Sequence, residues 1–311
     1  MRIARIYAVA LNTYREAVRD KVLFGVLVLA AGVLALTLAL GELSLDQQMR
    51  VVTDLGLASI SLFSVLVAIF LGSSLLYKEI ERKTLYVILP KPIARFEFLL
   101  GKYFGIVATC AVFVAIMGAL QRLVTAIQAG ASTTLVIAVP AALLAILAVS
   151  FLLSKDRALV VPIWSLTALG ASAWLCSQVD VELFTLLASL VPNLGEVLIL
   201  TAVALLFSSF STPFLTGAFT FGVWMVGRSA NDMVAMKTRV LSPSMKTILS
   251  WLAEVVPNFN LFVPGRNTLV MRAATYGEPL TYVATSMSYA ILYAAATLFV
   301  AALIFRRRDF L

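Results

Sequence analysis

The residues whose types and spacing most clearly suggest a function lie in one charged segment, 77–102. This segment separates two long apolar runs. It reads YKEIERKTLYVILPKPIARFEFLLGK and mixes Lys and Arg with Glu. That composition suits charge-assisted contacts with a partner in water. Pro90 and Pro92 predict the end of one helix and the start of the next. Ile93, Phe96 and Phe98 predict a short helix lying flat on the membrane surface. The alternative is a solvated loop whose charge only sets the membrane topology.

Patterns for catalysis and for metal binding are missing from the sequence. There is no His, which is the commonest general base and metal ligand. The two cysteines, Cys110 and Cys176, lie in apolar runs, where a thiol behaves as a small hydrophobic group. Gly101-Lys102 is followed by Tyr103, so the phosphate-binding loop of nucleotide-hydrolysing enzymes is not formed there. We expect no catalytic residue, metal site or cofactor on this chain.

Two further polar features interrupt the apolar runs. The segment 208–213 predicts a tight turn at which two helices approach closely, or ordinary helix packing. Its small or turn-forming residues are Ser208, Ser209, Ser211, Thr212 and Pro213. Glu196 and Arg228 fall near the outer ends of neighbouring runs. We expect their side chains to extend to the membrane interface, although an ionisable group at membrane depth can also mark a functional site.

The elements that position these residues are membrane helices. The 311 residues are 61% hydrophobic and 13% charged, with a mean hydropathy of +1.00. The net charge is +8, but the basic residues cluster at the ends of apolar runs, which argues against a nucleic-acid partner. We predict an all-α polytopic membrane domain over 1–311 with about eight spans. The apolar runs are 22–41, 58–77, 99–121, 133–153, 158–178, 190–209, 212–231 and 282–305.

Charge predicts the orientation of these spans. Lys and Arg gather in 1–21, 78–102, 154–157 and 306–308, while Arg50 and Arg122 alone are assigned to short connections on the other side. The basic side faces the cytoplasm, so both termini are expected there. Residues 1–20 form an amphipathic pattern that predicts a helix in the membrane interface, or a simple topology anchor. The long segment 232–281 falls outside, with short helices expected near 245–256 and 267–276.

The charged segment resembles the first cytoplasmic loop of ATP-binding-cassette type-2 permeases, in which acidic residues, a Thr, Pro-x-x-Arg-x-x-Phe and Gly-Lys follow in order. Three more segments are similar to that family: ARIYAVALNTYREAVRDKVLF, LLFSSFSTPFLTGAFTFGVWMVG, and PNFNLFVPGRN with the last span ending in IFRRRDF. The resemblance covers the chain except about 122–190. There the hairpin 133–178 departs from the six spans usual in the family.

The resemblance implies a permease subunit of an ATP-driven exporter in a bacterial or archaeal cytoplasmic membrane. It would pair with a second permease copy or close relative and with separate nucleotide-binding ATPase subunits that carry ATP and Mg²⁺. By analogy, the segment 78–98 contains a coupling helix that contacts the ATPase, and 208–213 forms a second inner contact. The coupling residues implied are Glu79, Glu81, Arg82, Lys83, Pro90, Pro92, Ile93, Arg95, Phe96, Glu97 and Phe98.

Three other classes of protein remain open from the residues alone. A stand-alone secondary transporter is expected to carry intramembrane carboxylates or broken helices. A membrane-embedded enzyme would need a catalytic constellation facing a cavity. A membrane anchor of a complex that transports nothing would need neither feature.

Overall fold

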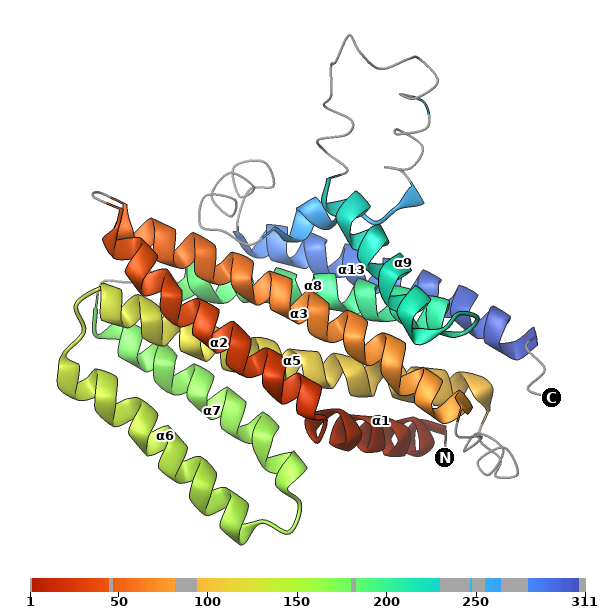
Figure 1. Ribbon diagram of the computed structural model, residues 1–311, viewed down its shortest axis with the longest axis horizontal. Coiled ribbons are helices and arrows are strands. Elements are labelled where there is room, and N and C mark those ends of the chain that lie inside the picture. The colour runs from red at the N-terminus through yellow and green to blue at the C-terminus, as the bar shows by residue number, and fades with distance from the viewer. Residues whose placement is uncertain are drawn as a thin grey trace.

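The computed structural model describes residues 2–44, 47–81, 94–179, 183–229, 247, 255–263 and 279–307. All the regular elements in these ranges are helices (Figure 1), so the predicted all-α fold is confirmed for them. Seven of the helices are long and apolar enough to cross a membrane. They are α2 (Lys21–Glu42), α3 (Gln48–Glu81), α5 (Arg95–Gln128), α6 (Thr133–Leu153), α7 (Arg157–Ser177), α8 (Leu183–Ser208) and α13 (Pro279–Arg307).

The eighth apolar run forms a shorter helix, α9 (Pro213–Arg228), of 16 residues. At 1.5 Å per residue it is about 24 Å long, whereas a hydrocarbon core is about 30 Å thick. Beyond the end of α9, the described chain resumes before the short 3₁₀-helix η1 (Phe259–Phe262). Phe259 and Phe262 are both fully buried. Because Gly227 faces the Pro257 carbonyl and the Phe259 ring, η1 packs directly against the end of α9.

The centre of the bundle is built from α3, α5 and α8. α3 and α5 each have 34 residues, which makes them about 51 Å long and longer than the bilayer is thick. Gly72 of α3 faces the Ala204 methyl of α8, and Gly118 of α5 faces Leu190 of α8. Small residues at these crossings let the helices approach closely, which is the usual basis of helix packing in membranes.

The hairpin predicted at 133–178 is formed by α6 and α7, which lie at one edge of the bundle (Figure 1). Each helix has 21 residues, so both are long enough to span rather than only re-enter. α6 has no buried residue, and it exposes large apolar side chains such as Ile137 and Leu144. This face is suited to contact with lipid.

The predicted N-terminal helix is α1 (Arg2–Val18), which packs along the start of α5. A Cβ added to Gly101 would lie 2.5 Å from Val9, and one added to Gly105 would lie 2.5 Å from Thr13. Because successive contacts advance in the same direction on both helices, α1 and α5 run parallel. The location of α1 in a membrane interface stays a prediction.

Two sequence-based expectations about the ends of spans are wrong. Arg122 does not lie in an outer connection, because α5 continues to Gln128 and buries Arg122 to 1% exposure. Its Nη1 donates to the Leu169 carbonyl of α7 at 2.9 Å. The expected flat helix near Phe96 is instead the first turn of α5. The helices expected at 245–256 and 267–276 lie outside the described residues, apart from 247, 255 and 256.

Candidate functional site

Those predicted coupling residues that the structure describes lie at the end of the bundle where α1 begins, α3 and α13 end and α5 begins (Figure 1). α5 starts after Ala94, whose extended backbone precedes the first helical turn. Glu97 Oε2 accepts a hydrogen bond from the Ala94 N–H at 3.3 Å. A carboxylate here satisfies a free backbone donor and complements the positive end of the helix dipole. The position at which α5 begins is therefore determined by a local contact between Ala94 and Glu97.

Ion pairs join α1 to α5 and to the turn between α6 and α7. Glu97 lies 3.7 Å from Arg5, and Lys102 Nζ lies 3.8 Å from Glu16 Oε2. Arg15 bonds Asp156, which immediately precedes α7. Lys102 is only 1% exposed and Glu97 5%. A buried charge is tolerated only where partners offset its loss of hydration. These ion pairs therefore hold α1 in position against α5.

Arg95 ties the first turn of α5 to the last turn of α13. Its Nη1 donates to the Phe305 carbonyl at 3.3 Å and to the Arg306 carbonyl at 3.0 Å. Carbonyls at a helix C-terminus have no partner within the helix, so a guanidinium there caps α13 and complements its dipole. Arg95 therefore links the start of α5 directly to the end of α13.

The described coupling residues divide between the interior and the surface. Phe98 is 4% exposed and fills the protein's own core, and Glu97 is engaged with Arg5, whereas Phe96 is 49% exposed. Glu79 and Glu81 fall in the last turn of α3. The others, Arg82, Lys83, Pro90, Pro92 and Ile93, lie outside the described residues. Contact of this set with an ATPase stays a prediction, and Phe96 is the member best placed for it.

The turn between α8 and α9 uses most of its polar residues internally. Ser208 and Ser209 are buried, and Ser211 Oγ lies 2.7 Å from Thr216 Oγ1. Thr212 is exposed and Pro213 opens α9. Two aromatic residues that the sequence reasoning passed over, Phe210 and Phe214, are 48% and 83% exposed. The sequence could have indicated these two residues, because aromatic residues in a short turn between apolar helices are candidates for contact with a partner.

A buried polar network lies among α3, α8 and α9. Glu196 is 0% exposed, and its Oε1 accepts from Arg228 Nη1 at 2.9 Å and from Trp224 Nε1 at 2.7 Å. Its Oε2 accepts from Ser61 Oγ at 2.8 Å. The Arg228 guanidinium also lies 5.7 Å from the Trp224 ring centre, within the range of a cation–π contact. The carboxylate is thus bonded at both oxygens.

The expectation that Glu196 and Arg228 extend to the interface is therefore wrong for Glu196. A short α9 brings Arg228 to the middle of α8, and the ion pair removes the need for either group to reach water. Trp224 precedes Arg228 by four residues, so helical spacing alone places them on one face. The Ser61 contact spans 135 residues of sequence and no local pattern announces it.

Asn193 and η1 complete the surroundings of this network. Asn193 precedes Glu196 by one helical turn and is 0% exposed, and neither its Oδ1 nor its Nδ2 has a hydrogen-bond partner among the described residues. Gly195 admits the Phe262 ring of η1, because a Cβ there would lie 2.7 Å from it. An unsatisfied buried amide beside an ion pair is a place where water or a polar ligand would be stabilised.

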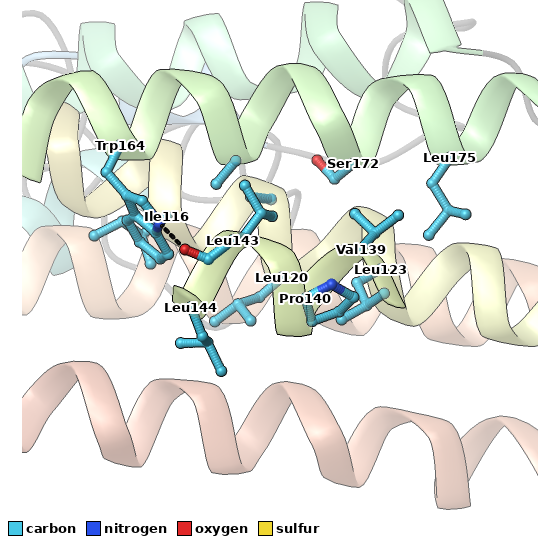
Figure 2. Close-up of a pocket in the computed structure, with 12 residues that line it drawn as sticks. Ile116, Leu120, Leu123, Val139, Pro140, Leu143, Leu144, Trp164, Ser172 and Leu175 are labelled. Atoms are coloured by element: carbon cyan, nitrogen blue, oxygen red, sulfur yellow. Dashed lines mark hydrogen bonds between the residues drawn. The ribbon is translucent and has the colours of Figure 1, made fainter. Parts of the chain in front are cut away.

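A separate apolar cavity of about 210 Å³ lies among α5, α6 and α7. Its lining, drawn in Figure 2, includes Leu120 and Leu123 of α5 and Val139 and Pro140 of α6. Trp164 lies at one end of the cavity, where its Nε1 donates to the Leu143 carbonyl at 2.8 Å (Figure 2). A carbonyl oxygen has two lone pairs, so the Leu143 carbonyl can accept this bond in addition to the one within its own helix. The lining offers no group for chemistry.

Comparison with models of known protein families and with curated proteins finds no match to this chain.

Proposed function

We propose that this protein is the permease subunit of an ATP-driven exporter, with ATP hydrolysis on a separate nucleotide-binding subunit. The observation that best supports this proposal is the contact of Arg95, at the start of α5, with the last turn of α13. The segment 82–93 links two helices of 34 residues, and its exit is bonded to the last turn of α13. A partner that moves this segment would act on helices that run through the whole bundle.

The absence of a phosphate-binding loop in the sequence makes a separate motor necessary for this mechanism. Moving a polar cargo through hydrocarbon is costly, so export against a gradient needs an external source of free energy. Exposed Phe96 offers apolar area to such a motor, and Phe210 and Phe214 offer more at the α8–α9 turn. Two permease copies would enclose the path, as the resemblance to type-2 permeases implies.

Site-specific photo-crosslinking tests the contact. A photoreactive phenylalanine analogue replaces Phe96 in the native host, and the matched control places it at Ile137, which is 65% exposed on α6. We expect position 96 to capture a nucleotide-binding subunit and position 137 to capture none. Capture of the same proteins at both positions, or of no protein at 96, would contradict the proposal.

One observation favours a second candidate, a stand-alone secondary transporter. Glu196 is a buried carboxylate beside a helix that ends within the bundle, and both features are typical of ion-coupled transport. Against this, both carboxylate oxygens are bonded to donors, and Arg228 neutralises the charge. A carboxylate that carries protons must exchange such partners, so we rank this function second.

Proton flux in vesicles separates the two candidates. The purified chain is reconstituted alone with an internal pH indicator, and flux under an imposed gradient is compared with that of Glu196→Gln and of the exposed control Glu42→Gln. The permease proposal predicts no flux above that of empty vesicles for any of the three. A flux lost only in Glu196→Gln would establish the second candidate.

A further inference from the structure

An apolar groove of about 480 Å³ lies where α1 and α7 meet α5. α1 contributes Tyr7 and Tyr14, α5 contributes Phe104 and Val112, and α7 contributes Leu166. Phe104 and Leu166 are 51% and 64% exposed, so the groove opens to the side of the bundle. In a membrane, an open apolar groove on this face would be occupied by a hydrocarbon chain.

A polar pocket of about 740 Å³ adjoins the groove at the end of α1. Their lining residues are neighbours on both walls, since Tyr14 and Leu159 line the groove while Arg15 and Asp156 line the pocket. The turn between α6 and α7 closes the pocket from the other side. The residues that line it are Asn12, Arg15, Glu16, Arg19, Lys155 and Asp156.

The charges of this pocket leave a positive excess. Its two carboxylates are engaged, because Asp156 bonds Arg15 and Glu16 pairs with Lys102. Arg19 and Lys155 are exposed, and neither forms an ion pair with the described part of the chain. Two cations on opposite walls of one pocket would bind an anion between them.

Two buried donors also lack acceptors at the junction of groove and pocket. The Tyr14 hydroxyl and the Arg15 Nε–H have no hydrogen-bond partner among the described residues, and Tyr14 is 5% exposed. Burial raises the pKa of Tyr14 to about 12, so its hydroxyl keeps its proton at physiological pH. A ligand that brings acceptor oxygens to this junction would satisfy donors that the protein leaves unbonded.

We propose that the groove and the pocket together bind one anionic phospholipid. Arg19 and Lys155 hold the phosphate, Tyr14 and Arg15 face the ester oxygens, and an acyl chain occupies the groove. A free phosphate ion would use the pocket alone, so the adjoining groove identifies the ligand as a lipid. This inference does not depend on the proposed function, because the residues that line the site belong to α1, α5 and the hairpin and include neither the predicted coupling residues nor Glu196.

A lipid titration tests the site on the full-length protein. The chain is delipidated in detergent and titrated with phosphatidylglycerol in mixed micelles, and the shift of the thermal transition gives the apparent affinity. We expect Arg19→Gln with Lys155→Gln to weaken binding by about thirtyfold, at the usual contribution of a cation near anionic lipid. The matched control is Lys21→Gln, an exposed cation that does not line the pocket and should leave the affinity unchanged.

A second variant tests the groove separately from the charge. Ala108→Trp fills the groove from α5, and Ala141→Trp places the same bulk on the exposed face of α6 as a control. We expect Ala108→Trp to weaken phosphatidylglycerol binding and Ala141→Trp to leave it unchanged.

Three results would overturn the proposal. The first is phosphatidylcholine binding as tightly as phosphatidylglycerol, because the site would then not select an anionic headgroup. The second is inorganic phosphate giving the same thermal shift at the same concentration, because the ligand would then be the ion. The third is an unchanged affinity in the Arg19, Lys155 double variant.

Discussion

At the scale of single residues, the ion pair of Glu196 and Arg228 decides how charge is accommodated inside the bundle. Glu196 is fully buried and accepts hydrogen bonds from Arg228, Trp224 and Ser61. Removing one member of a buried pair leaves the other charged and unpaired, which costs more than the pair itself contributes. This pair therefore fixes α9 against α8.

Arg228→Leu is expected to destabilise the protein by about 3–5 kcal/mol, because it leaves the Glu196 carboxylate buried without its counter-ion. Adding Glu196→Gln to the same chain should recover part of the loss, since no buried charge then remains. Thermal unfolding in detergent measures both. The matched control is Arg50→Gln, whose pair with Asp54 is exposed and is worth no more than about 1 kcal/mol. Equal stability of Arg228→Leu and Arg50→Gln would refute the assignment.

At this scale, contacts between residues close in sequence could be predicted, whereas contacts between distant segments could not. Helical spacing places Trp224 and Arg228 on one face, but nothing local indicates that Ser61 meets Glu196. The sequence predicts that Arg122 lies in a connection, because charged residues are rare within a span. The tertiary contact with the Leu169 carbonyl instead allows it to remain inside α5.

At the scale of elements, the parallel contact of α1 with α5 positions the charged end of the bundle. Gly101 and Gly105 admit Val9 and Thr13 so closely that no side chain fits at either glycine. The ion pairs of Glu97 and Lys102 with α1 form on the same stretch of α5. α1 is thus held by close backbone approach and by charge.

Gly105→Ala is expected to push α1 away from α5, because its Cβ would lie 2.5 Å from Thr13 and 2.6 Å from the Ala10 carbonyl. The cost should be about 1–3 kcal/mol, typical of an overpacked contact. Gly32→Ala in α2 is the control, since nothing lies within 4 Å of its added Cβ. It should be neutral or stabilising because Ala favours helix. Thermal unfolding of both variants checks this, and a destabilised Gly32→Ala with an unaffected Gly105→Ala would contradict the packing.

Most of the helices could be predicted from apolar runs, but their ends could not. α3 begins before the run 58–77 and α5 continues past the run 99–121, because Gln128 bonds Gln48 and Arg122 bonds the Leu169 carbonyl, so these polar residues contact other helices rather than ending the span. α9 stops at Arg228, short of the predicted 231, where Arg228 turns back to Glu196. Hydropathy reports how apolar a segment is. It does not report which polar side chains will bond to another helix.

At the scale of the whole molecule, the helices from α2 to α13 alternate in direction, and the start of α1 and the end of α13 lie at the same end of the bundle (Figure 1). The turns before α7 and after α8 lie toward that end as well. The excess of Lys and Arg in 1–21 and 154–157 predicts that this end faces the cytoplasm.

Accessibility of single cysteines tests that orientation. Cys110 and Cys176 are buried, and replacing both by Ala provides the background. A membrane-impermeant thiol reagent added to intact cells should label Ser132→Cys, in the connection before α6, and should not label Ser154→Cys, in the turn before α7. The reverse pattern would invert the topology and place the segment 82–93 outside, where no ATP-driven subunit could reach it.

The most direct test of the central claim is purification of the tagged protein from its native host in mild detergent, with mass spectrometry and an ATPase assay on the eluate. The permease proposal predicts a stoichiometric nucleotide-binding subunit with ATPase activity. It also predicts that both are lost in the double variant Glu81→Arg, Arg82→Glu and retained in the control Arg50→Glu. A clean oligomer of this chain with no ATPase, or a partner retained equally in both variants, would contradict the claim that 82–93 and its flanking residues couple this protein to a motor.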